Sequence, residues 1–236
     1  SPFPIEMVMK NRPNFLQKIG SYMEFGSKPK TPESVILHIH GGGFISQSSY
    51  VHQLYTRNWA NNLNTAIFSV DYRLAPDYQY PAALDDCYQA YMWMISYLHK
   101  VFGLFYSIVD VPAQSVVLVG DSAGGNIIAA LTGLLVKLSH PVPKGIVMVY
   151  PALSLTFSSY SPSLLNSLDD MLLPHTFLKM CLSCYVPEEI RAELDPFVSP
   201  IRFSDEILSK FPPCRMFVGN RDPFHDDCCR LAERLM

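Results

Sequence analysis

The stretch Val117-Leu118-Val119-Gly120-Asp121-Ser122-Ala123-Gly124-Gly125-Asn126 decides the fold. An apolar run ends in Gly-x-Ser-x-Gly, and the residues that follow, 127–138, are compatible with a helix. The pattern predicts a strand, a sharp turn and a helix, which together form a nucleophile elbow. Small neighbours let the backbone pass closely, so we expect the Ser122 hydroxyl above the edge of the sheet and predict Ser122 as a nucleophile.

A run of glycines follows a second apolar segment. Residues 35–40, Val-Ile-Leu-His-Ile-His, lead into Gly41-Gly42-Gly43. Valine and isoleucine favour the pleated sheet, and three glycines end it. Their N–H groups are free of side-chain obstruction and therefore suit the stabilisation of a developing oxyanion. We predict that the N–H groups of Gly42, Gly43 and Ala123 form an oxyanion hole beside Ser122.

Strands and helices alternate through most of the chain. Residues 35–40, 66–71, 115–120, 145–150 and 215–219 are predicted strands, and 82–99, 127–138 and 226–236 are predicted helices. Several strands are continuously apolar, which predicts an α/β fold with a mostly parallel central sheet and helices on both faces. Residues 154–200 contain five prolines and no strong strand, and are predicted to form a small helical lid. We expect residues 1–33 to be a lead-in or the remnant of an upstream region, and 34–236 to be one catalytic domain.

An acid that orients the base is expected after a late strand. Asp222 lies three residues beyond Gly219 and meets that condition, so we predict Asp222 in this role. Asp226 and Asp227 are nearby, but helix capping explains them more simply.

No histidine is well placed to act as the base. His225 lies within the same turn as Asp222, and His175 precedes the acid in the predicted lid. His38 is expected on the opposite face of its strand from His40, and both precede the elbow. We therefore expect the base, together with the last strand and helix of the fold, to lie beyond Met236.

Composition limits the function further. The 236 residues carry a net charge of −3, which gives no electrostatic footprint for nucleic acid. No apolar run is long enough for a transmembrane helix, and no signal peptide is visible. Among the six cysteines only Cys181 and Cys184 form a C-x-x-C, without a second pair at zinc spacing, so no metal or organic cofactor is expected and a cytoplasmic location is predicted.

Four motifs occur in the order and spacing of a known family. They are His40-Gly41-Gly42-Gly43-Phe44, Asp71-Tyr72-Arg73-Leu74-Ala75-Pro76, Pro81-Ala82-Ala83-Leu84-Asp85-Asp86 and Gly120-Asp121-Ser122-Ala123-Gly124-Gly125-Asn126. Over residues 33–236 the chain resembles the hormone-sensitive lipase family of α/β-hydrolases.

The resemblance implies a serine hydrolase of carboxylic esters, either lipid esters or small-molecule esters. Ser122 would attack the ester, Gly42, Gly43 and Ala123 would hold the oxyanion, and Asp222 would orient a histidine roughly thirty residues further on. Contact with a lipid surface, such as a membrane or a lipid droplet, is compatible with this class, and the oligomeric state is left open. Two alternatives also remain: an inactive scaffold within a larger assembly, and a serine deacetylase or peptidase.

Overall fold

Five parallel strands form the centre of the molecule. The computed structural model describes residues 34–103, 115–156 and 161–236. The strands are β1 (Val35–Ile39), β2 (Ile67–Val70), β3 (Val116–Asp121), β4 (Gly145–Val149) and β5 (Cys214–Phe217), in the spatial order β2-β1-β3-β4-β5. Every neighbouring pair is parallel, which confirms the predicted sheet. The predicted lead-in, 1–33, lies outside the described residues.

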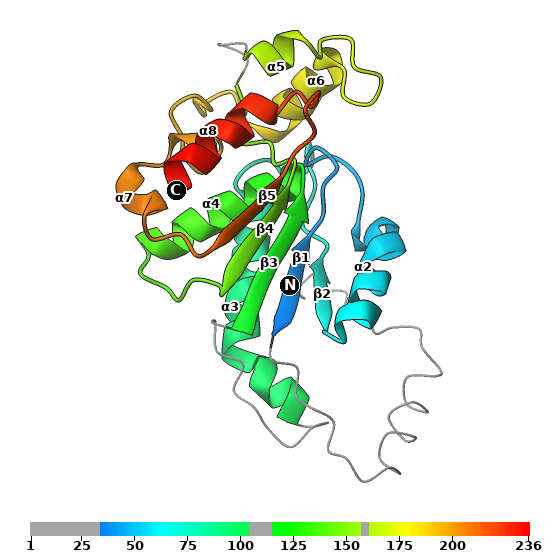
Figure 1. Cartoon of the computed structure of the whole chain (residues 1–236), viewed down its shortest axis with the longest axis vertical. Helices are drawn as coiled ribbons and strands as arrows, with labels where there is room; N and C mark the ends of the chain where they lie inside the picture. Colours follow the sequence, from blue (N-terminus) through cyan, green and yellow to red (C-terminus); the bar gives the residue numbers. More distant parts are fainter. Residues whose placement is uncertain (1–33, 104–114, 157–160) are drawn as a thin grey trace.

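The helices connect and cover these strands (Figure 1). They are α2 (Ser49–Leu63), α3 (Ala82–Gly103), α4 (Ala123–Lys137), α5 (Pro162–Leu165), α6 (His175–Tyr185), α7 (Asp205–Leu208) and α8 (His225–Leu235), with a short 3₁₀ helix, η2 (Pro200–Arg202). Helix α2 was not predicted. Helix α4 begins four residues earlier than predicted, because the turn at Ser122 leads directly into it.

Side chains of β1 alternate between two environments. Leu37 and Ile39 belong to the main core, which also contains the buried residues of α3 and α4. His38 points to the other face, where its ring contacts Tyr55 of α2. Helices therefore cover both faces of the sheet, as the continuous apolar strands indicate.

The carboxyl ends of the strands form the edge on which the site is built. Because all five strands run in one direction, the loops after β1, β3 and β5 meet at this edge. Helices α5 and α6 lie beyond it (Figure 1). The described part of residues 154–200 contains these helices and no strand, in agreement with the helical segment predicted there.

Candidate active site

Ser122 occupies a strained backbone conformation at the end of β3. Its φ of 52° and ψ of −117° are unfavourable for a residue with a side chain, and such strain costs on the order of 1–3 kcal/mol. The turn is held by its own backbone: the Ser122 N–H donates to the Val149 carbonyl (2.9 Å), and the Ser122 carbonyl accepts from the Asn126 N–H (3.1 Å). A side chain at Gly124 would place its Cβ 2.1 Å from the Ile39 carbonyl oxygen, so only glycine allows this approach of α4 to β1.

Three residues with unpaired backbone N–H groups line the same cavity as Ser122. Gly42 and Gly43 have φ angles of +114° and +63°, a conformation that turns the chain sharply after β1. Within the part of the chain that the structure describes, the N–H groups of Gly42, Gly43 and Ala123 have no hydrogen-bond acceptor. All three residues line a cavity of about 640 Å³ together with Ser122. Free donors beside a nucleophile are the arrangement that stabilises an oxyanion.

Residues 40–44, called here the oxyanion loop, are fixed by contacts at both ends. The Gly41 N–H donates to Asp121 Oδ1 (3.3 Å), which ties the loop to the residue preceding Ser122. At the other end the ring of Phe44 stacks on Tyr185 of α6, with the centroids 3.8 Å apart and the planes 4° from parallel. The donors are therefore positioned before any substrate binds.

Asp222 follows β5, at the same edge of the sheet as Ser122. Its Oδ1 accepts a hydrogen bond from the Phe224 N–H (2.8 Å). Burial raises the pKa of Asp222 above its usual value, and the nearby Asp170 adds to the rise. This place, at the carboxyl edge of the sheet, is the one that the predicted role requires, and the role itself stays a prediction.

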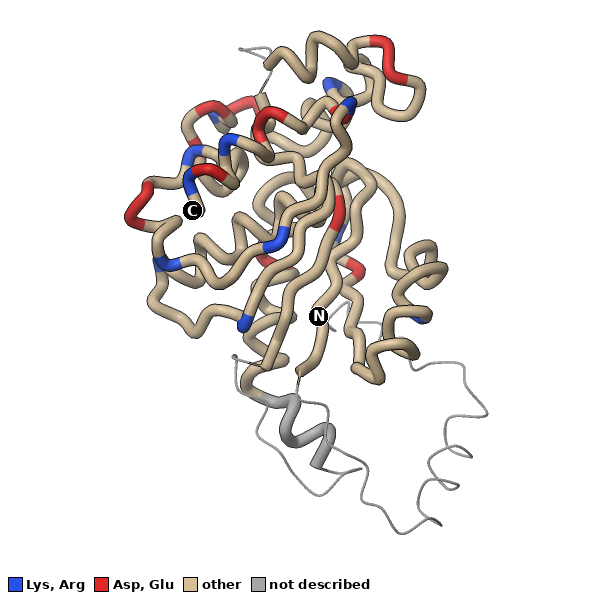
Figure 2. Tube along the Cα trace, in the orientation of Figure 1, with Lys and Arg blue, Asp and Glu red and all other residues tan. Residues whose placement is uncertain are grey.

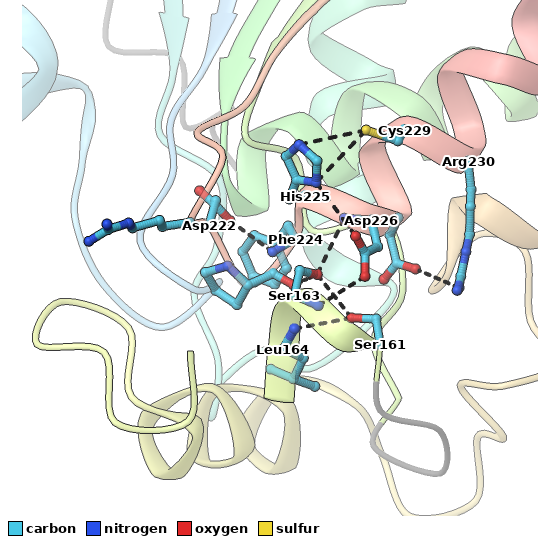
Figure 3. Close-up of polar contacts among 12 residues, drawn as sticks. Ser161, Ser163, Leu164, Asp222, Phe224, His225, Asp226, Cys229 and Arg230 are labelled. Carbon is cyan, nitrogen blue, oxygen red and sulfur yellow. Dashed lines mark hydrogen bonds and ion pairs between the residues drawn. The ribbon is translucent and has the colours of Figure 1, made fainter. Parts of the chain in front are cut away.

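The acidic residues of α8 do not cap that helix, so the capping interpretation is wrong. The Asp226 carboxylate accepts from the Ser163 N–H (2.9 Å) at the start of α5 (Figure 3). Asp227 pairs with Arg230 on the same helix, at 3.4 Å. Asp226 therefore fastens the predicted lid to α8, a long-range role that a local sequence pattern does not reveal.

Five histidines with described side chains have partners away from the Ser122 hydroxyl. His225 contacts Asp226 (3.5 Å) and Cys229 (3.8 Å), and its ring is turned toward them in Figure 3. The other four contact the Ser69 hydroxyl (His38), the Gly41 carbonyl (His40), the Ser48 carbonyl (His52) and the Tyr88 hydroxyl (His140).

The prediction that His38 and His40 face opposite ways is wrong. Residues two apart on a strand share a face. Accordingly, both rings lie beside His52 of α2, with centroid separations of 5.6 and 5.5 Å. Sequence reasoning overlooked His52, although it follows the glycine run by only nine residues.

The cavity has an apolar part and a charged part. The apolar lining comes largely from residues 155–182, and the charged lining from η2 and α8. The apolar side chains are Leu155, Leu164, Leu173, Phe177, Leu178 and Leu182, and the charged ones are Arg202, Asp227, Arg230, Glu233 and Arg234. In Figure 2, charged positions are spaced along α8, whereas the trace along α5 and α6 is mostly uncharged.

The described residues contain neither a metal-ligand cluster nor a membrane-spanning helix. No group of three or more histidine, cysteine, aspartate or glutamate side chains there is arranged to hold a metal ion. Among the helices described, none is both long and apolar enough to cross a membrane.

Three features define the structural class of this protein: the parallel sheet, the strained serine after β3 and the glycine loop after β1. The chain belongs to the α/β-hydrolase fold family, whose profile matches residues 36–236.

Three individual relatives within this fold family are a lipase and two esterases. The chain is 38% identical to hormone-sensitive lipase of Mus musculus over 179 residues, which are 75% of this chain and 22% of that protein. It is 30% identical to an esterase of Acinetobacter venetianus over 200 residues, 85% of this chain and 60% of the other. A solved esterase of Pyrobaculum calidifontis superposes with a TM-score of 0.77 at 30% identity, covering 88% of this chain and 65% of that one. The resemblance predicted from the four motifs is confirmed, and the chain spans about a fifth of the mammalian lipase that it matches.

Proposed function

We propose that the protein hydrolyses carboxylic esters through an acyl intermediate on Ser122. The observation that carries the proposal is the cavity that joins Ser122 to three N–H groups without acceptors. Strain at a serine and unused donors beside it are costly features that a structural turn does not need. The lipases and esterases among the relatives support the same reaction.

The proposed reaction uses this geometry as follows. A base removes the Ser122 proton as the oxygen attacks the ester carbonyl, and the N–H groups of Gly42, Gly43 and Ala123 bind the tetrahedral oxyanion. Collapse of this intermediate releases the alcohol, which takes the proton from the base. Water then attacks the acyl-Ser122 ester by the same route and releases the acid. Each oxyanion donor contributes on the order of a hundredfold or more to the rate.

The base is proposed to be a histidine that reaches Ser122 from outside the described residues and is oriented by Asp222. The partners found for the five histidines support this proposal, since each ring is already committed elsewhere. The raised pKa of Asp222 also supports this proposal, because it indicates a buried carboxylate whose charge is not yet balanced. An imidazole that becomes protonated beside Asp222 would supply the balancing positive charge.

Labelling with a fluorophosphonate, mapped by mass spectrometry, tests the proposal. The 236-residue chain and the chain expressed to the natural end of its coding sequence are compared, with Ser122→Ala and the exposed Ser183→Ala as a matched pair. We expect labelling of Ser122 that Ser122→Ala alone removes. Labelling in neither chain would favour the inactive scaffold instead, and faster cleavage of matched amides than of esters would favour a deacetylase or peptidase.

We also propose that the substrate is a lipid or other apolar ester. The apolar lining of residues 155–182 and the cavity of about 640 Å³ support an acyl chain of moderate length. Nitrophenyl esters of increasing chain length test this directly. We expect kcat/KM to rise from acetate to octanoate in the wild type and less steeply in Phe177→Ser. An equal preference for acetate in both proteins would contradict the proposal.

Contact with a lipid surface is the further part of this proposal. The side chains of Met171 and Leu172 are 97% and 87% exposed, and the next residue, Leu173, lines the cavity. Flotation with phosphatidylcholine vesicles tests the contact. We expect the wild type to bind the vesicles and the double variant Met171→Ser with Leu172→Ser to bind them more weakly, while cleavage of a soluble ester stays unchanged.

The six free cysteines support the predicted cytoplasmic location.

A further inference from the structure

A cluster of three histidines, His38, His40 and His52, lies where β1 and the start of the oxyanion loop meet α2, and the reaction described above does not use it. We propose that His52 is a positioning residue: it holds the Asp121 carboxylate against the Gly41 amide, and its positive charge offsets Asp121 beside the oxyanion. This inference rests on the proposed ester hydrolysis.

Asp121 connects the two halves of the proposed machinery. It directly precedes Ser122, and its Oδ1 accepts from the Gly41 N–H (3.3 Å) and from the Tyr55 hydroxyl (3.2 Å). His52 Nε2 lies 3.6 Å from the same oxygen, with both side chains largely buried. A separation of 3.6 Å is long for a hydrogen bond, so the contact between His52 and Asp121 is mainly one of charge.

The hydrogen bonds define which nitrogen of His52 faces the carboxylate. His52 Nδ1 lies 2.9 Å from the Ser48 carbonyl oxygen. A carbonyl only accepts, so Nδ1 carries a hydrogen in either charge state. Protonation of the ring therefore adds a hydrogen at Nε2, toward Asp121.

The neighbouring histidines do not share this charge. Burial lowers the pKa of His38 to about 4, and burial also lowers the pKa of His40. For His52, burial alone would lower the pKa, but the contacts with Asp121 and the Ser48 carbonyl raise it above its usual value. The titratable groups that face His52 are His38, His40, Tyr55, Asp71 and Asp121.

An unbalanced carboxylate at Asp121 would oppose the reaction. The tetrahedral intermediate places a negative charge on the N–H groups of the oxyanion loop, which Asp121 contacts through Gly41. A second negative charge in a poorly hydrated site raises the energy of that intermediate, whereas a charged His52 cancels much of the effect. We therefore expect that loss of His52 lowers kcat more than it raises KM.

The test measures kcat and KM against pH for the chain expressed to the natural end of its coding sequence. Wild type is compared with His52→Gln, Asp121→Asn and the double variant, and His140→Gln serves as the control for loss of a remote histidine. Because the pKa of His52 is raised, the charged form is present at low pH and is lost as pH rises through that pKa. We expect the wild-type kcat to fall on this alkaline limb.

The His52→Gln variant should lose the limb and about tenfold in kcat, with KM changed less than twofold. Asp121→Asn keeps an oxygen for the Gly41 N–H and removes the charge, so adding His52→Gln to it should cause little further loss. Independent, additive losses would overturn the proposal, as would a wild-type profile in His52→Gln. Thermal unfolding of each variant identifies a folding defect.

A second cavity permits a rescue experiment. It has a volume of about 340 Å³ and is lined in part by His52, Tyr55 and Asp121. Added imidazole should therefore raise kcat in His52→Ala and leave His52→Gln unchanged, and no rescue of His52→Ala would count against the proposal.

A measurement without catalysis separates this proposal from the proposed function. Titration of the His52 ring by NMR should show a lower pKa in Asp121→Asn than in wild type. If wild type does not cleave esters, the proposed function fails, and an unchanged His52 pKa in Asp121→Asn overturns the present proposal by itself.

Discussion

Replacing Gly43 with alanine tests how closely the predicted lid supports the oxyanion loop. The added Cβ would lie 2.6 Å from Cys181 Sγ of α6, and the backbone φ is +63°. The positive φ costs a residue with a side chain about 1–2 kcal/mol. The collision adds about 1–3 kcal/mol, as overpacking of a filled site does. Together they should lower the free energy of unfolding by about 2–5 kcal/mol and reduce kcat by displacing the Gly43 N–H.

Cys181→Ala separates the two contributions. Removing Sγ leaves Cys181 Cβ 3.3 Å from the added carbon, a tight but tolerable contact. In Gly43→Ala with Cys181→Ala, the collision should disappear and only the conformational cost should remain. Gly42→Ala is the matched control, because its Cβ would meet the Ser46 carbonyl oxygen at 2.2 Å and no side-chain change relieves that. Urea unfolding and kcat on a soluble ester measure both effects. Additive losses in the Gly43 double variant would refute the reasoning.

Three further predictions concern residues around the same site. Asp222→Asn should abolish ester cleavage yet stabilise the fold at neutral pH. The raised pKa of Asp222 means that its ionised form is disfavoured in the folded state, so the neutral asparagine should raise the free energy of unfolding at pH 7. This gain in stability should vanish when urea unfolding is measured below the pKa of Asp222 in the unfolded chain, and a variant less stable than wild type at pH 7 would contradict the prediction. His225→Gln should keep kcat within about twofold, because its ring contacts Asp226 and Cys229; a loss above a hundredfold would make His225 the base. Asn126→Ala should lower the free energy of unfolding by about 2–4 kcal/mol, since the Asn126 amide donates to the buried Ala152 and Val198 carbonyls at 2.7 and 3.0 Å; a loss below 1 kcal/mol would contradict this.

The parallel sheet and the elbow were predictable because local chemistry determines them. The strands β1, β3 and β4 are apolar at nearly every position, whereas a half-exposed strand is apolar at every second position. Glycine at position 124 indicates that another backbone segment passes close by. Such signals depend on residues close in sequence. The approximate positions of the strands and the two glycine turns follow from them without knowledge of the rest of the chain.

The contacts of α2 and α8 were not predictable in the same way. Asp226 has the position of a helix-capping residue, but its partner, Ser163, lies 63 residues earlier. Helix α2 has a weakly apolar sequence, and its importance comes from His52 and Tyr55, whose partners are on β1 and β3. Polar contacts over such sequence distances leave no periodic pattern, so only the folded structure reveals them.

The strand order limits where the proposed histidine base can act. Ser122 follows β3 and Asp222 follows β5, with β4 between them. Neighbouring strands are about 4.8 Å apart, so the two strand ends are separated by about 10 Å. An imidazole with a hydrogen bond at each nitrogen spans about 7–8 Å between two oxygens, which suits this gap once the side chains reach inward.

Tyr150 marks the place where that ring would lie. It follows β4 directly, and burial together with the charges of Asp121 and Asp222 raises the pKa of its hydroxyl, so both carboxylates act on this one position. A base above Tyr150 would stand between acid and nucleophile. Enlarging the neighbouring Ala152 to leucine should therefore slow fluorophosphonate labelling of Ser122 about tenfold or more, in the chain that carries the base, without unfolding the sheet. Unchanged labelling in a folded Ala152→Leu variant would place the base elsewhere.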